Sequence, residues 1–399
     1  MIKLVKIPDE IYPMYRSDVI FNGYKWDPQV GDHNTVSDYV LVMDQKTADY
    51  LDEQAEKLSE ETMNLEETVL TKPDLIKKLG LPRKIQKALL KIKNYSREDN
   101  IRLMRFDFHP TTTGWMVSEV NSDVPGGYAE GSILPEIACK YLPNVQPHHN
   151  LGNELLKAFI QKVPENGHIG LVYATSYSDD RQVMQFFGDL LKKNNRFAHY
   201  LAPDHLTWTG SGVSSLLTPG INLAAILRFF PLEWLITLPH KAYWQNYFTS
   251  GVASCNHPIT ITTQSKRLPL IWDKLNVPTD TWKKLLPKTV DPRMAKGIKG
   301  NWIYKPALGR VGEAISIKKA ITEKEYKKIL KAVKRNPKYW VAQEMFDSLP
   351  LPTQENTEMH LCVGVFTVNG KRAGFYGRIC PYPRIDANAK DIPILILKE

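Results

Sequence analysis

Two alternating runs of residues set the fold of this chain: Arg102-Leu103-Met104-Arg105-Phe106-Asp107-Phe108 and, after Thr111-Thr112-Thr113-Gly114, Trp115-Met116-Val117-Ser118-Glu119-Val120-Asn121. Side chains on a strand alternate between two faces, so Arg105 shares a face with Asp107, and Glu119 shares a face with Asn121. A hairpin centred near Thr113 places Asp107 opposite Glu119 and Arg105 opposite Asn121. The runs therefore predict an antiparallel hairpin with four polar groups on one patch, and with Phe106 and Phe108 on the other side.

This patch has the chemistry of a site for Mg²⁺ and a triphosphate. Asp107, Glu119 and Asn121 offer hard oxygen ligands, and Arg105 offers a fixed cation. The spacing alone is equally compatible with a surface hairpin held by a cross-strand salt bridge. The loop that follows, Ser122-Asp123-Val124-Pro125-Gly126-Gly127, favours a ligand site, because glycines let the backbone approach a bound molecule.

A second motif places one lysine on a short apolar strand. Lys305 lies in the expected strand Trp302–Pro306, and a loop with Gly309 and Gly312 follows it. A lysine in an apolar strand is costly unless it meets an anion, and the amides of a glycine loop can bind phosphate. By itself the motif is weak evidence for phosphate binding, and it matches neither the P-loop nor the Rossmann pattern.

Two later segments are candidates for the same site. Gln343 and Glu344, in an expected strand from Trp340 to Met345, offer a strand edge and polar groups to a nucleobase. Arg378 follows a hairpin turn at Asn369-Gly370, a strong turn signal between apolar runs. Both segments are equally compatible with structural roles. The ten histidines, His148-His149 included, show no metal-ligand spacing and are expected to be ordinary.

Composition narrows the class of protein. The 399 residues are 43% apolar, enough for a large core and two or three subdomains. The excess of 52 basic over 43 acidic residues gives a net charge of +9, which makes nucleic acid a rival partner. The densest basic stretch, Lys324–Arg335, however, follows a capping box, Thr322-x-x-Glu325, and carries an apolar stripe, so its lysines are expected to form a solvated helix face. We expect no nucleic-acid partner.

Neither a membrane nor an oxidising compartment is indicated. The most apolar window, Ile221–Leu238, is interrupted by Arg228, Pro231 and Glu233, so it predicts a buried segment. The four cysteines are scattered and form no C-x-x-C pair, and the N-terminus lacks a signal-peptide pattern. We expect a cytoplasmic protein with reduced thiols.

The order of elements predicts an α/β or α+β fold. Residues 1–100 contain amphipathic helical patterns, such as Pro73–Ile92, and are assigned a packing role. The expected regions after them are a hairpin region at 101–146, an α/β subdomain at 147–258 and a further α/β region at 259–399. Within the subdomain we expect a strand at Ile169–Ala174, a helix at about Asp179–Lys193 and a strand at Phe197–Ala202.

Taken together, these motifs resemble the synthetase domain of the glutathionylspermidine synthase family. The resemblance spans about residues 100–399 and is carried by Arg105-Phe106-Asp107-Phe108, Glu119-x-Asn121-x-Asp123, Lys305-Pro306-x-x-Gly309-Arg310-x-Gly312, Gln343-Glu344 and Phe366-Thr367-Val368-x-Gly370…Arg378. It implies an ATP-grasp fold with a preATP-grasp-like subdomain at 147–258 and a nucleotide-binding region at 259–399. The metal motif precedes the nucleotide lysine here, the reverse of the usual order, so a circular permutation is implied.

The resemblance also implies an activity and its residues. Asp107, Glu119 and Asn121 would bind Mg²⁺, while Arg105 and Arg378 would stabilise the transferring phosphoryl group. Lys305 and a second lysine, identified with Lys266 one place away from the family spacing, would bind ATP together with Gly309, Gly312, Gln343 and Glu344. The expected reaction is ligation of a carboxylate to an amine through an acyl phosphate. The alternative is a catalytically inactive ATP-binding protein with a regulatory or structural role.

The substrates are less closely defined than the reaction. The family joins glutathione to spermidine, but Val124 and Gly126 stand here where the family places hydroxyl side chains that hold glutathione. Asp179 and Asp180 either match the family's acidic substrate residues or cap a helix. A peptide carboxylate and an amine are therefore expected as small-molecule partners, with the acyl donor, the amine and the oligomeric state left open.

Overall fold

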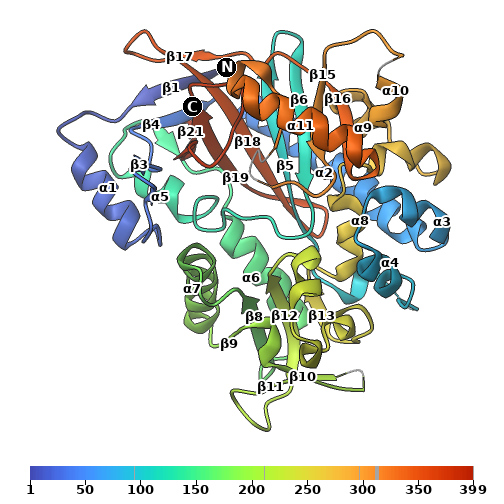
Figure 1. The fold of residues 1–399 in the computed structure, drawn as a ribbon. Helices are drawn as coiled ribbons and strands as arrows, with labels where there is room; N and C mark the ends of the chain where they lie inside the picture. Colours follow the sequence, from blue (N-terminus) through green and yellow to red (C-terminus); the bar gives the residue numbers. More distant parts are fainter. Residues whose placement is uncertain (94, 211, 296, 311–313, 399) are drawn as a thin grey trace.

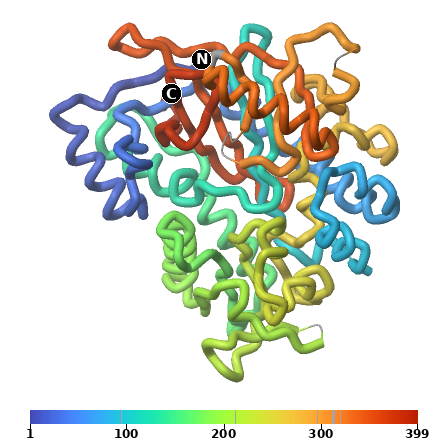
Figure 2. Tube along the Cα trace, viewed as in Figure 1, coloured from blue at the N-terminus to red at the C-terminus, as the bar shows by residue number. Residues whose placement is uncertain are grey.

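A computed structural model of the protein describes residues 1–93, 95–210, 212–295, 297–310 and 314–398, with Lys319 described by its backbone alone. Long antiparallel strands occupy the upper part of the molecule and a parallel sheet with two helices occupies the lower part (Figure 1). The two ends of the chain lie near each other (Figure 2), because β1 (Ile2–Lys6) and β21 (Ile394–Leu397) both pair with β4 (Tyr39–Met43). The fold is a mixed α/β arrangement with several sheets, and both ends of the chain join one of them.

The central sheet joins the two predicted hairpins. Its order is β20-β19-β18-β5-β6, and β17 (Leu351–Pro352) pairs with β18. The strands are β5 (Leu103–Thr111), β6 (Gly114–Asn121), β18 (Glu358–Val368), β19 (Lys371–Cys380) and β20 (Lys390–Ile392). Both hairpin predictions are confirmed, and Asn369 and Gly370 turn with positive φ angles of 49° and 80°. The sequence patterns did not reveal that β5 pairs with β18.

The long helix α2 (Gln45–Val69) lies against this sheet. Asp44 caps it by accepting a hydrogen bond from the backbone N–H of Thr47. Its apolar stripe includes Leu51 and Leu58, which belong to the same core as Phe106 and Phe108. The aromatic side chains of β5 therefore pack into the core, as the alternation predicts, and leave the opposite face of the sheet for polar groups.

The parallel sheet confirms the predicted α/β unit. Its order is β13-β12-β8-β9, with all pairings parallel. The elements are β8 (His168–Tyr173), α7 (Ser178–Lys193), β9 (Phe197–Leu201), β12 (Leu223–Phe229) and β13 (Ala253–Cys255), and α6 (Leu151–Lys162) packs beside α7. The apolar window expected to be buried forms β12 and the turn after it.

A smaller sheet, β14-β16-β15, carries the lysine motif. Its strands are β14 (Thr289–Val290), β15 (Trp302–Pro306) and β16 (Trp340–Glu344). β15 and β16 match the predicted strands, whereas β14 was not predicted. The basic helix α11 (Glu323–Arg335) begins after Thr322, whose hydroxyl accepts from the Glu325 N–H, so the Thr322 half of the predicted capping box is confirmed. The carboxylate of Glu325 accepts from Arg384. Ile329 and Val333 on its apolar stripe are buried.

The remaining elements come mostly from the N-terminal segment and from the connections. They are β2 (Gln29–Val30), β3 (His33–Asn34), β7 (Val145–Gln146), β10 (Leu206–Thr209), β11 (Gly212–Ser215), α1 (Tyr12–Phe21), α3 (Pro73–Ile76), α4 (Arg83–Leu89), α5 (Ile133–Cys139), α8 (Ile261–Gln264), α9 (Asp280–Leu285) and α10 (Pro292–Ala295). The helical pattern at 73–92 is interrupted, because Gly80 adopts a left-handed φ of 69° and Pro82 follows it. Among the described helices, none combines the length and the apolar character needed to cross a membrane.

Candidate active site

The hairpin β5–β6 has the register that its alternation predicts. Arg105 pairs with Asn121 and Asp107 pairs with Glu119. One bulge lies between Asp107 and Phe108, so two residues of β6 oppose one residue of β5 there. The bulge breaks the alternation of β6, and Ser118 and Glu119 both line the pocket described below.

Arg105 is held on this face by hydrogen bonds and by the ring of Tyr376. Its Nε and Nη2 donate to Oδ1 and Oδ2 of Asp107 at 2.8 and 3.1 Å, and its Nη1 donates to the carbonyl oxygen of Gly126 at 2.8 Å. Its guanidinium carbon lies 5.0 Å from the ring centre of Tyr376. A Cβ on Gly364 would lie 2.7 Å from Cδ of Arg105, so the bare backbone of β18 makes room for the side chain.

Asp107 lies between two arginines. Arg378, on β19, places Nη2 3.6 Å from Oδ2 of Asp107. Burial favours the neutral form of the carboxyl, but Arg105 and then Arg378 outweigh it, and the pKa of Asp107 is below its usual value. Asn121 also donates from Nδ2 to Oδ2 of Asp107 at 3.1 Å. We call Arg105, Asp107 and Arg378 the arginine–aspartate cluster.

Glu119 is paired with the lysine whose register was uncertain in the sequence. Nζ of Lys266 lies 2.8 Å from Oε2 of Glu119 and donates to the carbonyl oxygen of Gly309 at 2.7 Å. Burial opposes ionisation of Glu119, but Lys266 and Lys305 offset it, and the pKa of Glu119 is lowered. Lys266 thus links the metal-ligand candidate on β6 to the glycine loop after β15.

Lys305 has much weaker compensation for its charge. The residue is 4% exposed, and Nζ donates to the backbone carbonyl oxygen of Ser118 at 3.3 Å. Burial lowers the pKa of Lys305 to about 8, with Lys266 also lowering it and Glu119 and Asp107 raising it. A buried ammonium group with a depressed pKa is suited to receive an anion.

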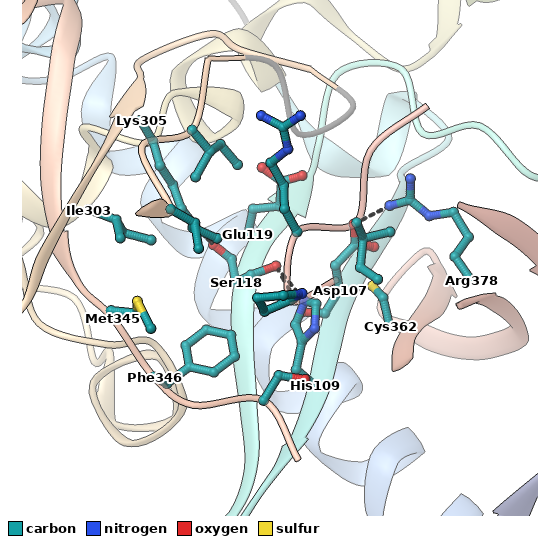
Figure 3. A pocket seen from close by; sticks show the side chains of 16 residues that line it. Asp107, His109, Ser118, Glu119, Ile303, Lys305, Met345, Phe346, Cys362 and Arg378 are labelled. Atoms are coloured by element: carbon teal, nitrogen blue, oxygen red, sulfur yellow. Dashed lines mark hydrogen bonds and ion pairs between the residues drawn. The ribbon is translucent and has the colours of Figure 1, made fainter. Parts of the chain in front are cut away.

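Asp107, Glu119, Lys305 and Arg378 line one pocket between the central sheet and the small sheet, and Arg384 adds a further cation to its lining. The pocket is open to solvent and has a volume of about 700 Å³. Figure 3 shows Arg378, Cys362 and Asp107 on one side, and Lys305, Ile303, Met345 and Phe346 on the other. The pocket therefore combines a charged end with an apolar wall, as sites for phosphorylated ligands often do.

The other predicted nucleotide residues lie around this pocket. Gln343 lines a neighbouring cavity of about 390 Å³, which shares Ser118 and Glu119 with the first and also contains Lys266. Nε2 of Gln343 donates to Thr289, and its buried Oε1 has no hydrogen-bond partner among the described residues. Glu344 points away on the other face of β16 and is exposed. The structure brings Gly309 to Lys266, whereas Gly312 lies outside the described residues.

Some residues of the site were missed in the sequence. His109 follows Arg105 and Asp107 at the strand interval of two residues. Its position on the same face of β5 could therefore have been predicted from the sequence. Its ring bonds to Ser118 at 3.0 Å, and burial lowers its pKa to about 4, so it is neutral near pH 7. Ser118 was hidden by the bulge. Cys362 could be found only from the pairing of β18 with β19, which sets it opposite Arg378.

Tyr376 and its partners form a layer behind the arginines. The ring of Tyr376 lies 5.0 and 5.7 Å from the guanidinium carbons of Arg105 and Arg378. Its hydroxyl donates to Asp391 at 2.6 Å, and Asp391 forms an ion pair with Lys25 at 2.6 Å. The N-terminal segment, expected to serve packing alone, thus supplies a charge to the support of the site.

The candidate substrate residues Asp179, Asp180, Val124 and Gly126 lie on α7 and on the loop after β6. Asp179 and Asp180 lie in the first turn of α7, and burial raises the pKa of Asp180 to about 6. The helix has no side-chain hydrogen bond from its N-cap, Tyr177. In the glycine loop after β6, the carbonyl oxygen of Gly126 accepts from Arg105, and Val124 packs against the hydrophobic core that includes residues of β8, β12, α6 and α7.

A solved structure that matches almost the whole chain supports this architecture. A solved structure of a glutathione synthetase-like effector from Globodera pallida matches over 97% of this chain and 98% of its own, with a TM-score of 0.63 and 12% identity. A putative gamma-glutamylcysteine synthetase from Methylobacillus flagellatus covers 82% of this chain and 88% of its own, with a TM-score of 0.46 and 11% identity. The search of curated proteins gives no match.

The family comparison extends further along the chain than the motifs do. The model of the glutathionylspermidine synthase preATP-grasp family matches residues 7–385, so it includes most of the N-terminal segment as well as the motifs after residue 100. The chain belongs to the glutathionylspermidine synthase preATP-grasp family.

Proposed function

We propose that the protein is an ATP- and Mg²⁺-dependent ligase that joins a peptide carboxylate to an amine. The observation that carries this proposal is the set of charges at the pocket, where the carboxylates of Asp107 and Glu119 lie among four cations, close to the apolar side chains of Ile303, Met345 and Phe346. Arg378 and Lys305 line the pocket, and Arg105 and Lys266 are ion-paired with its two carboxylates. Such an arrangement suits a triphosphate with its metal, because both signs of charge are needed to hold it.

The donor set fits Mg²⁺. Asp107 and Glu119 are opposite each other in the hairpin, both have lowered pKa values, and Asn121 contacts Asp107. Two ionised carboxylates and an amide are the oxygen ligands that this hard cation prefers. When bound, Mg²⁺ would neutralise charge on the phosphate oxygens. Ile303 and Met345 offer an apolar surface to the nucleobase, while Lys266 and Lys305 would hold the phosphates.

The residues of this chain would act by position and charge. The γ-phosphoryl group of ATP passes to an oxygen of the substrate carboxylate, giving an acyl phosphate and ADP. The amine nitrogen then attacks the acyl carbon, the C–O bond to phosphate breaks, and inorganic phosphate leaves with the amide formed. Arg105 and Arg378 would stabilise the charge on the transferring group, and their contacts with Asp107 would lower the cost of placing them there.

The substrates are proposed at the level of chemical class. Family membership supports a peptide such as glutathione as acyl donor and a polyamine as amine. Val124 and Gly126 offer no hydroxyl group to the peptide, so a donor other than glutathione is an equal candidate. Asp179 and Asp180 are candidate contacts for the amine, because paired carboxylates attract ammonium groups.

The test is ADP release by the purified protein with Mg-ATP. A panel of peptides, glutathione included, is crossed with polyamines and amino acids, and each product is identified by mass. We expect release that requires both a carboxylate and an amine. ATP binding without release across the panel would overturn ligation of these substrate classes and would favour an inactive ATP-binding protein. A Glu119→Gln variant is the matched control for contaminating ATPases.

A further inference from the structure

A second cluster of possible metal ligands lies outside the pocket. It is formed by Asp52, on α2, and by His148 and His149, in the segment before α6. One ligand atom from each residue lies within 4.8 Å of the others, in the part of the chain that the structure describes. The sequence did not suggest the group, because adjacent histidines have no ligand spacing and Asp52 is almost a hundred residues away.

The contacts in this cluster converge on one carboxylate. Nε2 of His148 lies 2.6 Å from Oδ2 of Asp52, and Nε2 of His149 lies 3.4 Å from the same oxygen. Asp52 is 1% exposed, and its other oxygen, Oδ1, has no hydrogen-bond partner among the described residues. A buried carboxylate oxygen without a partner is costly, and a bound cation would satisfy it.

The ligand residues are held in place by their surroundings. The ring of His148 stacks on Phe375 of β19, with 5.0 Å between centres and 19° between planes. Asp52 is fixed on a long helix between the buried residues Leu51 and Ala55.

We infer that Asp52, His148 and His149 form a site for a transition-metal ion, and that Zn²⁺ is the ion these ligands suit best. Two imidazoles and one carboxylate are ligands that suit Zn²⁺ rather than Mg²⁺, and water would complete a tetrahedral set. The metal would take the place of the direct contact between His148 and Asp52. Arg372, which is half exposed, places Nη1 3.7 Å from Asp52 and can turn away toward solvent.

The site would join three parts of the chain. It ties α2 to the segment before α6, and His148 connects both to β19 through Phe375. α2 and β19 belong to the packing around the central sheet. A bound ion would therefore stabilise the folded protein without taking part in the proposed ligation.

The experiment is a Zn²⁺ titration of the metal-stripped full chain by calorimetry, with excess Mg²⁺ present to fill the pocket. Stoichiometry is checked by elemental analysis and the ligand set by the visible spectrum of the Co²⁺ form. We expect one Zn²⁺ per chain and a rise in melting temperature. His149→Gln and His148→Gln should each weaken binding at least about 100-fold.

The control is the double variant His168→Gln with His199→Gln. Nδ1 of His168 and Nε2 of His199 also lie close together, at 2.9 Å. Among the described residues, however, this pair is not part of a group of possible metal ligands. This variant should bind Zn²⁺ like the parent. Two results would overturn the inference: no Zn²⁺ binding by the parent, which would leave a buried aspartate–histidine ion pair only, or equal binding by all variants. Because His149 is 27% exposed on its side chain, its variant should fold, and circular dichroism checks this.

Discussion

The two sides of the pocket differ in how their charges are compensated. On the central sheet, Arg105 makes two hydrogen bonds to Asp107, and Arg378 stands 3.6 Å from the same carboxylate. On the small sheet, Lys305 faces a backbone carbonyl at 3.3 Å, and its pKa is lowered to about 8. The first side is assembled before any ligand arrives, whereas the second is destabilised until an anion is present.

This difference suggests a division of work between the sides. Groups that stabilise a transition state act best when their positions are fixed in advance, because no reorganisation is then needed. A charged group contributes most to ligand affinity when its charge is poorly compensated in the free protein. We therefore expect changes on the central sheet to reduce turnover, and changes at Lys305 to weaken nucleotide binding while leaving the fold intact or more stable.

The largest effect is expected at Glu119. Glu119→Ala and Glu119→Gln should each lower ADP release by about a thousandfold or more, because they remove a proposed metal ligand. Circular dichroism and melting should show a folded protein, since the carboxylate lies at the pocket and outside the core. Glu358→Ala, which changes an exposed carboxylate at the start of β18, is the control. Loss of folding in the Glu119 variants would make the residue structural.

Substitutions of the two arginines should have similar effects on kcat and different effects on the free energy of unfolding. Arg105→Met and Arg378→Met should each lower kcat by about 100- to 1000-fold. Arg105→Met should also destabilise the fold by about 3–5 kcal/mol, because it leaves the buried Asp107 without its bidentate partner. Arg378→Met should cost less stability, since its contact is longer. Urea unfolding measures both, and equal losses of stability would contradict the assigned roles.

The sequence could predict those parts of the site that depend on residues close together in the chain. The register of Arg105, Asp107, Glu119 and Asn121 is local, since strand alternation and one turn determine it, and it was predicted correctly. The α/β unit at 168–201 was predicted for the same reason. Alternation gives no information on which hairpins pair, so the pairing of β5 with β18 came only from the structure.

Departures from regular pairing account for other misses. The bulge in β6 turned Ser118 into the pocket, against the predicted alternation. Lys25 was unpredictable, because it reaches Asp391 across most of the length of the chain. The roles of Lys266, Gln343 and Glu344, the domain boundaries and the circular permutation stay predictions.

Lys305 should show effects of opposite sign on stability and on binding. Lys305→Met removes a buried charge whose pKa is lowered, so it should stabilise the nucleotide-free protein by about 1–3 kcal/mol. The same change should weaken ATP binding about 10- to 100-fold, because a charge-assisted hydrogen bond is lost. Urea unfolding and calorimetric titration measure the two. Destabilisation together with unchanged affinity would show that the charge is structural.

The lowered pKa of Lys305 also gives ATP binding a pH dependence. Below pH 8 the free protein already carries the ammonium charge, so affinity is at its highest. Above pH 8 the amine is neutral in the free protein and must take up a proton when phosphate binds and raises its pKa. Affinity should therefore fall as pH rises past 8, by at most about tenfold per unit. Lys305→Met should remove this dependence, and a slope that persists would assign it to another group.

The smallest effect is expected at Tyr376, which supports the central-sheet side from behind. Tyr376→Leu removes the ring beside both guanidinium groups and should lower kcat about 3- to 10-fold with KM unchanged, because a cation–π contact positions the arginines without touching substrate. Tyr376→Phe keeps the ring and loses the hydrogen bond to Asp391, so its kcat should stay near that of the parent. A Phe variant as slow as the Leu variant would show that the hydroxyl group and its link to Asp391 and Lys25, rather than the ring, hold the arginines in place.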